Sequence, residues 1–593
     1  MKRYHEIGGD AGSRTLEQVA EQRAGGHLLY AARAVQLGFV IAAAGVILSG
    51  AQPPFDVVIR GGDLLDGSGA PARRMDVGVR GDTIAAIGDL STAAGRRTID
   101  AAGLVVSPGF IDMHSHSDYP VLVDGRALSK VTQGVTTELL GESDSAGPVL
   151  GPVRQERETS LADLGLVLDW STLQSYFARV ERQQVSVNLL SSVAAGTLRA
   201  GVMGFDDRPA TPGELLRMAE LVEEAMQQGA VGLSSGLIYP PNSYASTEEL
   251  IALARVAARH GGIYVTHIRN EGDRLLQALQ EAIRIGREAG IPVEVLHFKR
   301  SSVRLAAGEE SGTIREAAAL LEEAQRDGVR IYADVYPYAA SATTLSTRLP
   351  DWVLEGGTDR LLERLRSPET RTRIRAELDV LLSRGVAGAT PETILLSRTP
   401  YEPHRQLQGR RLTEIARELG QSASDAMIEL IEKGDNRVGA VFFSMREEDV
   451  EFALTRPWTT IGSDGSALAP EGILARSSPH PRSYGTFPRV LGRYVRERQA
   501  LTLPEAIRKM TSLAASRLGL ADRGTLAAGW KADIVVFDST TILDRATFEA
   551  PHQLSTGVRW LLVNGEIVIE DGRHTGATPG RILRRAPEPR SGL

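Results

Sequence analysis

Residues 105–116 read VVSPGFIDMHSH, an apolar run that ends in two histidines one residue apart. A β-strand alternates its side chains between two faces, so residues i and i+2 point to the same side. His114 and His116 are therefore expected to converge on one space at the end of a strand. Two convergent imidazoles are the start of a metal site, and the simpler alternative is a pair of surface histidines.

The chain that follows alternates apolar strands with amphipathic helices. This pattern is typical of βα units and a parallel sheet. The eight candidate strands end near His116, Gly141, Val193, Ser234, His267, His297, Asp334 and Asp464. Eight such units predict an α/β protein with a (β/α)₈ TIM-like barrel, whose chemistry lies at the C-terminal ends of the strands.

Short strands and glycine turns flank this alternating region on both sides. They occupy residues 55–108 and return in 521–593, which predicts one small β-sandwich domain built from both chain ends. The barrel is expected over 109–520. Charged helix formers interrupt it at about 345–455, and this insertion is expected to cover the barrel mouth as a lid.

The first 54 residues have a different character from the rest. A polar lead precedes an apolar stretch at 37–48, and small residues follow at 49–51. The stretch is short for a membrane span, which needs about 20 residues, and it favours a signal peptide. We expect export to the periplasm or the medium, without stable membrane insertion after processing. An uncleaved membrane anchor and a cytoplasmic N-terminal helix are the alternatives.

The bulk composition limits the possible chemistry. The 593-residue chain has a net charge of −7, which gives no indication of a nucleic-acid partner. It has no cysteine, which excludes disulfides, thiolate ligands and a cysteine nucleophile. No phosphate-binding loop or dinucleotide fingerprint stands out. The oligomeric state is not indicated.

Further metal-ligand candidates stand at predicted strand ends. His267 ends the run GIYVTH, His297 ends IPVEVLH, and Asp464 lies in TTIGSDG. Imidazole and carboxylate ligands with an open coordination position suit a catalytic Zn²⁺ site of one or two ions. Asp464 is also a candidate general base that later acts as general acid, although a turn residue or a purely structural ligand is the alternative.

A series of motifs resembles the amidohydrolase superfamily, and more narrowly the N-acyl-D-amino-acid deacylases (D-aminoacylases), over about residues 54–575. The motifs are PGFIDMHSH (108–116), GVTT (134–137), GLSSGLIYPP (232–241), THIRNE (266–271), HFK (297–299), DVYPY (334–338), GSDG (462–465), HPRSYGTF (480–487) and GWKADIVVFD (529–538). The resemblance implies zinc-dependent hydrolysis of the amide bond of small-molecule N-acyl amino acids, with D-isomers expected. A dipeptide, cyclic amide or lactone substrate is the enzymatic alternative, and a non-catalytic binding protein is the alternative from another class.

One departure from that family concerns the metal site. Its metal-binding cysteine after the second strand is missing, and a gapless count places Ser143 there. A serine hydroxyl is a poor zinc ligand at neutral pH, so we favour the adjacent Glu142 as a bridging carboxylate; a cap for the following loop is its alternative role. The fourth strand carries no lysine that could form a carboxylated bridge, which disfavours hydantoinase-like and dihydroorotase-like subtypes.

A deacylase also needs a cation for the α-carboxylate of its substrate. Lys299 and Arg482 are the candidates, because arginine grips carboxylates bidentately and Lys299 lies two residues past His297. The resemblance places Tyr336 and Ser341 in the same pocket. The alternatives are a solvated loop charge for Arg482 and ordinary packing for Tyr336.

Overall fold

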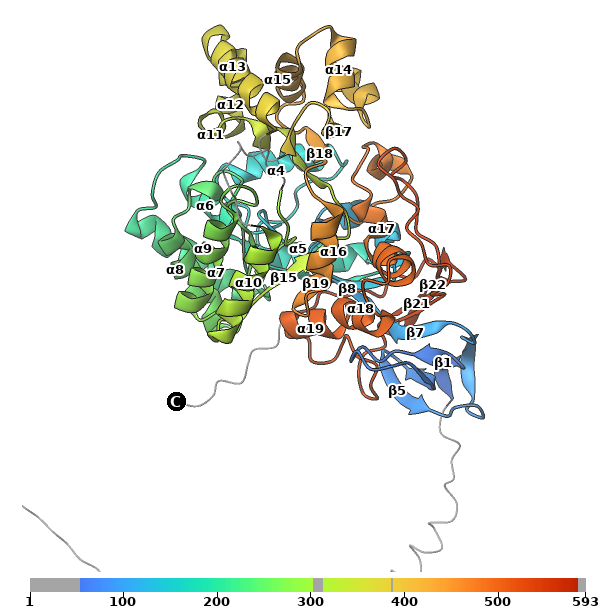
Figure 1. Cartoon of the computed structure of the whole chain (residues 1–593). Coiled ribbons are helices and arrows are strands. Elements are labelled where there is room, and N and C mark those ends of the chain that lie inside the picture. Colours follow the sequence, from blue (N-terminus) through green and yellow to red (C-terminus); the bar gives the residue numbers. More distant parts are fainter. Residues whose placement is uncertain (1–53, 302–312, 386–387, 585–593) are drawn as a thin grey trace, which may run out of the picture. The chain divides into compact units, whose positions relative to one another are not determined.

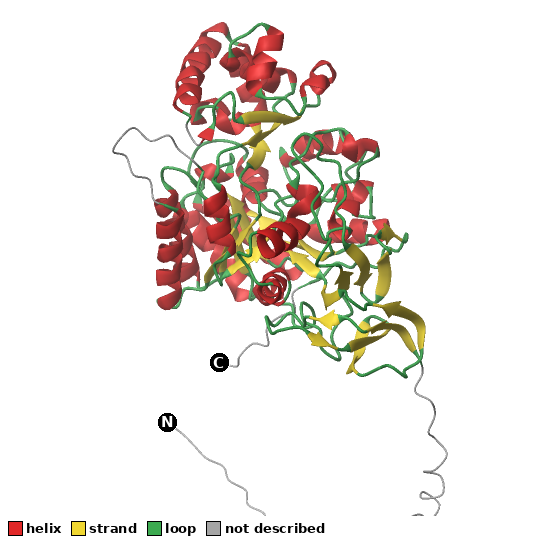
Figure 2. Ribbon diagram, turned by 45° about the vertical axis from the view of Figure 1, so that its right-hand side comes forward, coloured by secondary structure: helices red, strands yellow, loops and turns green. Residues whose placement is uncertain are grey.

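The computed structural model describes residues 54–301, 313–385 and 388–584 (Figures 1 and 2). The expected signal-peptide core at 37–48 lies outside these residues. Within them, no helix combines the length and the apolar character that crossing a membrane requires.

Eight parallel strands form a barrel, which confirms the predicted fold class. They are β8 (Phe110–Asp112), β9 (Val135–Leu140), β10 (Asn188–Ser191), β12 (Gly232–Gly236), β13 (Ile263–His267), β14 (Val293–Val295), β15 (Ile331–Val335) and β19 (Thr459–Ile461). The short β11 (Val193–Ala194) continues β10 and pairs with β12. Every pairing recorded between neighbouring barrel strands is parallel.

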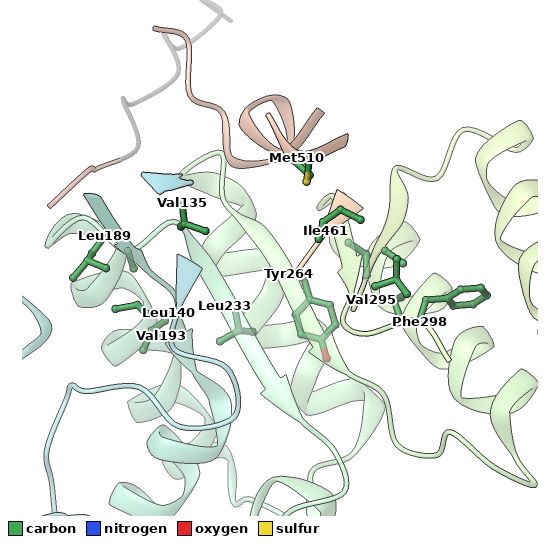
Figure 3. Close-up of a cluster of buried hydrophobic side chains, with 14 of the residues drawn as sticks. Val135, Leu140, Leu189, Val193, Leu233, Tyr264, Val295, Phe298, Ile461 and Met510 are labelled. Atoms are coloured by element: carbon green, nitrogen blue, oxygen red, sulfur yellow. The ribbon is translucent and has the colours of Figure 1, made fainter. Parts of the chain in front are cut away.

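Helices cover the outside of the barrel because each presents one apolar face to the strands. The covering helices include α6 (Ala195–Met203), α7 (Pro212–Gln227), α8 (Thr247–Arg259), α9 (Leu275–Ala289), α10 (Ile314–Arg326), α16 (Glu447–Leu454) and α18 (Leu503–Met510). The start of α7 is fixed by a capping box between Thr211 and Glu214. Figure 3 shows part of the resulting core, with strand residues such as Leu233 and Val295 buried together.

The barrel interior is mainly apolar below the C-terminal strand ends. Ile263, Val265 and His267 occupy every second position of β13, so their side chains share one face of the strand. The two apolar residues belong to a buried cluster that also contains Ala514 and Leu518 of α19 (Ser512–Leu518). This cluster fills much of the barrel below His267, where the buried Glu294 of β14 pairs in register with Val265 and accepts a hydrogen bond from Thr460.

A β-sandwich joins both ends of the described chain, as predicted. One sheet contains β1 (Phe55–Arg60), β4 (Asp76–Arg80), β5 (Thr83–Gly88) and β6 (Gly95–Asp100). The other contains β2 (Asp63–Leu64), β3 (Arg73–Arg74), β7 (Val105–Pro108), β20 (Ile534–Phe537), β21 (Val558–Val563), β22 (Glu566–Glu570) and β23 (Arg573–His574). The antiparallel pairing of β20 with β7 holds the chain just before it enters β8 and the two histidines.

A separate subdomain interrupts the barrel between β15 and β19 (Figure 1). Its antiparallel sheet contains β16 (Ser341–Thr344), β17 (Ile394–Arg398) and β18 (Gly439–Phe442). Its helices are α11 (Asp351–Leu354), α12 (Gly357–Arg366), α13 (Pro368–Arg384), α14 (Leu412–Leu419) and α15 (Ala423–Lys433). These elements bury a hydrophobic core of their own. A lid function for this subdomain stays a prediction.

The remaining helices lie in the loops that follow the barrel strands. They are α2 (Pro120–Val123), α3 (Leu128–Val131), α4 (Val153–Ala162), α5 (Leu173–Gln183) and α17 (Arg482–Arg489). The first two stand between the histidine pair and β9, and α17 follows the loop after β19. These loops supply further residues to the barrel mouth.

Candidate metal centre

All six predicted ligand residues lie just at or beyond C-terminal strand ends. His267 is the last residue of β13, and Glu142 follows β9 by two residues. His297 and Asp464 follow β14 and β19, and both have left-handed backbone conformations, with φ of 40° and 50°. Such conformations are uncommon for residues other than glycine and often mark functional sites.

Two groups of three potential ligands face each other across the barrel mouth. His114, His116 and Asp464 form the first group, in which His116 Nε2 lies 3.1 Å from Asp464 Oδ1. Glu142, His267 and His297 form the second, in which His297 Nε2 lies 3.0 Å from His267 Nδ1. Within each group the ligand atoms all lie within 4.8 Å of one another.

Glu142 connects the two groups through its two carboxylate oxygens. Its Oε2 lies 3.3 Å from His114 Nε2 and 3.2 Å from His116 Nε2, while its Oε1 lies 3.3 Å from His267 Nδ1. The Ser143 hydroxyl donates to Glu142 Oε1 at 2.9 Å. This arrangement is what a bridging carboxylate requires, and it favours Glu142 over Ser143 as the substitute for the missing cysteine.

The residues present fit a metal ion. Four imidazoles and two carboxylates are the donor types that zinc accepts. Burial raises the pKa of Glu142, but the hydrogen bonds from His114 and His267 outweigh it and hold that pKa well below its ordinary value. Burial and the nearby Lys299 charge lower the pKa of His297 to about 3. The carboxylate is therefore ionised and this imidazole neutral, as metal ligation requires.

Asp464 and His116 form a charged pair at the mouth of the site. Burial opposes the charged form of Asp464, yet the Arg482 and His114 charges keep its pKa well below the ordinary value. Burial likewise opposes a charge on His116, but the hydrogen bond to Asp464 and the Glu142 charge raise its pKa to about 9. A proton on His116 thus neutralises part of the negative charge of Asp464 and Glu142.

Three of the predicted substrate residues, Lys299, Ser341 and Arg482, line one large cavity of about 2100 Å³ over the two ligand groups, whereas Tyr336 is buried beside Arg482 and is not part of the cavity lining. Arg482 Nη1 lies 2.8 Å from Asp464 Oδ2, and its guanidinium carbon lies 4.9 Å from the centre of the Tyr336 ring. Lys299 Nζ lies 5.7 Å from the same ring centre. Ser341, at the start of β16, lines the cavity as well. The structure brings the two cations to the same aromatic ring.

Sequence reasoning assigned no role to two further residues of the site. Glu271 Oε1 lies 2.5 Å from Lys299 Nζ and 2.9 Å from His297 Nδ1. The ring of Tyr239 meets His267 edge-on at 5.3 Å, and its hydroxyl contacts Thr343 of β16 at 2.8 Å. Both residues belong to motifs quoted above. The position of Glu271, four residues after His267, was the signal in the sequence that could have indicated a carboxylate near the metal ligands.

The fold and the site define a barrel protein of the metal-dependent hydrolase class. Residues 97–569 match the model of the Amidohydrolase family, and this chain belongs to that family. The family resemblance inferred from the motifs is thereby confirmed.

Within this family, the chain is similar to three deacylases of N-acyl-D-amino acids. The D-aminoacylase of Alcaligenes xylosoxydans xylosoxydans is 40% identical over 533 residues, which cover 90% of this chain and 98% of the relative. The N-acyl-D-glutamate deacylase of the same organism is 36% identical, with 90% and 97% covered. A crystal structure of the N-acyl-D-glutamate deacylase from Bordetella bronchiseptica, with zinc and a phosphonate inhibitor, matches with a TM-score of 0.74 at 35% identity, covering 90% of this chain and 100% of that one.

Proposed function

We propose that this protein hydrolyses the amide bond of N-acyl-D-amino acids in a zinc-dependent reaction and releases a carboxylate and a free amino acid. The observation that carries the proposal is the pair of facing ligand groups joined by Glu142 at the C-terminal strand ends. The similarity to D-aminoacylase and N-acyl-D-glutamate deacylase over 90% of the chain supports the substrate class.

His114, His116 and Asp464 would hold one Zn²⁺ ion, and His267 with His297 would hold a second, with Glu142 shared between them. Zinc bound at such a site would lower the pKa of water to about 7 and would polarise the carbonyl of the substrate. The number of ions is one or two, because each group supplies three ligand atoms within 4.8 Å.

Asp464 is the proposed proton carrier. Its carboxylate is ionised and faces the cavity through Oδ1 and Oδ2, which approach His116 and Arg482 respectively. It would accept a proton from the water that attacks the amide carbonyl, and then deliver that proton to the nitrogen of the leaving amino acid. Arg482 would keep the carboxylate oriented during both transfers.

The cations above the ligand groups would bind the α-carboxylate of the substrate. Arg482 and Lys299 both lie over the Tyr336 ring, which brings the two positive charges near one place. Ser341 could donate a further hydrogen bond from the first strand of the inserted subdomain. A fixed α-carboxylate would place the scissile amide next to Asp464.

The direct test uses the purified protein with zinc restored after chelation. Release of free amino acid from N-acetyl-D-methionine and its L-isomer is measured beside a panel of dipeptides, cyclic amides and lactones. We expect activity on the N-acetyl-D-amino acid, loss with chelator and recovery with Zn²⁺. Turnover confined to a lactone or dipeptide would refute the proposed substrate class, and activity that survives complete metal removal would refute the zinc dependence.

We also propose that the protein is exported. The support is the apolar stretch at 37–48 with small residues at 49–51, which has the length and composition of a signal-peptide core. N-terminal sequencing of the protein from fractionated cells tests this. A mature N-terminus near residue 52 in the periplasm or medium is expected, and an intact N-terminus in the cytoplasm would refute it.

A further inference from the structure

The barrel has a seam between its first and last strands, and the proposed ligands lie on both sides of it. Among the described residues, β8 is the edge of one hydrogen-bonded arc and β19 is the edge of the other. In the part of the chain that the structure describes, the backbone hydrogen bonds across the seam are Met113 N to Ile461 O at 3.3 Å, Asp464 N to His114 O at 2.8 Å and His116 N to Gly465 O at 3.0 Å, and they form no named strand pairing. The first ligand group therefore depends on a junction that lacks a regular β-ladder.

A buried lysine spans this seam. Lys130 of α3 has no exposed side-chain surface. On the β8 side its Nζ lies 2.7 Å from Asp112 Oδ2 and 3.2 Å from Ser115 Oγ. On the β19 side the same nitrogen lies 2.8 Å from Ser463 Oγ and 3.1 Å from Gly465 O. One ammonium group thus binds the residues that flank the proposed ligands on both strands.

Asp112 extends this connection to the backbone of both strands. Its Oδ1 accepts hydrogen bonds from His114 N at 3.2 Å and from Ser463 N at 2.7 Å. Asp112 is fully buried, and burying a carboxylate is unfavourable unless a charged partner lies beside it. Lys130 supplies that charge through Asp112 Oδ2, and it also lies 3.2 Å from the buried Glu138 carboxylate.

We propose that Lys130 is a positioning residue that locks β8 and β19 in register, so that His114, His116 and Asp464 converge on one metal ion. Lys130 touches none of these three side chains, and it acts through Asp112, Ser115, Ser463 and Gly465. The inference rests on the proposed metal site, because the register of the seam matters to the reaction only if the ligands on its two sides bind together.

A second buried lysine offers a matched control. Lys509 of α18 is also fully buried and donates to Thr459 O at 3.1 Å and to Arg456 O. Thr459 is the first residue of β19, at the end of the strand away from the proposed metal site. Burial lowers the pKa of Lys509 to about 7, so this group carries less charge than Lys130, but removing its hydrogen bonds should still cost stability while leaving the β8–β19 register at the ligands unchanged.

The experiment compares Lys130→Met and Lys509→Met with the wild type in the full-length chain. The readouts are the zinc affinity in a chelator competition, the visible spectrum with Co²⁺ in place of zinc, kcat and KM, and the melting temperature. For Lys130→Met we expect zinc affinity about 10- to 100-fold weaker, an altered Co²⁺ spectrum and a lower kcat with little change in KM. For Lys509→Met we expect a lower melting temperature, with zinc affinity within about twofold of the wild type by the additivity of distant sites.

Equal zinc affinity and an unchanged Co²⁺ spectrum in Lys130→Met would overturn the proposal, as would equal losses in both variants. If Lys130→Met does not fold, Ser463→Ala removes one of its acceptors with a smaller perturbation. An altered Co²⁺ spectrum in that variant supports the proposal and an unchanged spectrum overturns it. A wild-type chain that binds no zinc would instead refute the proposed metal site itself.

Discussion

Replacement of the Glu142 carboxylate by an amide is the sharpest test of how the site compensates for its missing cysteine. Glu142→Gln keeps the size and shape of the side chain but removes its charge. In the structure one carboxylate oxygen faces His114 and His116 at 3.3 and 3.2 Å, and the other faces His267 at 3.3 Å. A neutral amide can offer one weaker oxygen ligand to one group and presents an NH₂ group to the other.

The expected magnitude follows from these two contacts. Each interaction with a charged group contributes about 1.5–3 kcal/mol, so losing one on each side costs at least about 3 kcal/mol. That corresponds to a zinc affinity about 100-fold weaker, since every 1.4 kcal/mol is a factor of ten. Ser143→Ala removes one hydrogen bond to Glu142 Oε1 but leaves the carboxylate and its charge in place, so its effect on zinc affinity should be smaller than that of Glu142→Gln.

The assay is equilibrium dialysis against chelator-buffered zinc, followed by metal analysis and by the rate on N-acetyl-D-methionine. Glu142→Gln should lose zinc at free concentrations where the wild type and Ser143→Ala remain loaded. Glu142→Asp is a useful companion, because it keeps the charge but withdraws it by one methylene group. If Ser143→Ala loses zinc while Glu142→Gln binds it normally, the bridging assignment of Glu142 is wrong and serine, or a water that it holds, takes that place.

Three further outcomes are expected. His267→Ala and His297→Ala should each abolish activity while the circular dichroism spectrum stays that of a folded protein, because both residues stand at strand ends in the barrel mouth; normal turnover by either would remove it from the site. Asp464→Asn should retain zinc by metal analysis and lose about 10²- to 10⁴-fold in kcat, since an amide cannot accept the proton, and a rate near that of the wild type would point to another base. Burial raises the pKa of Glu294 from 4.5 to about 7, so the folded protein keeps a proton that the unfolded chain releases between these pH values. Wild-type stability should therefore fall as the pH rises through this range, and urea unfolding should find Glu294→Gln more stable by up to about 3 kcal/mol at pH 8 but not at pH 4.

Much of the fold follows from local patterns in the sequence. Strand-length apolar runs alternating with amphipathic helices predicted the eight-stranded barrel, because burial on both faces of a parallel strand and on one face of a helix leaves distinct periodicities. The pairing of both chain ends in one β-sandwich was also predictable from their shared strand-and-turn pattern. The irregular hydrogen bonding between the first strand, β8, and the last, β19, was not predictable, because it depends on contacts between residues that are far apart in the chain.

The same division applies to the site. Histidines at the ends of predicted strands can be recognised from the sequence as candidate metal ligands, because all C-terminal strand ends of a parallel barrel lie on one face. The preference for Glu142 over Ser143 needed the tertiary structure, because only the folded barrel shows that the Glu142 carboxylate lies 3.2–3.3 Å from His114, His116 and His267. Other contacts of the site likewise join residues that are distant in the chain. Lys130 contacts Ser463, 333 positions away, and His116 contacts Asp464, 348 positions away. The sequence by itself determined the types of ligand and the face of the barrel on which they gather. The closed barrel decided which charged groups lie within reach of one another. Coulomb and hydrogen-bond interactions depend on distances, and only the tertiary structure sets those distances.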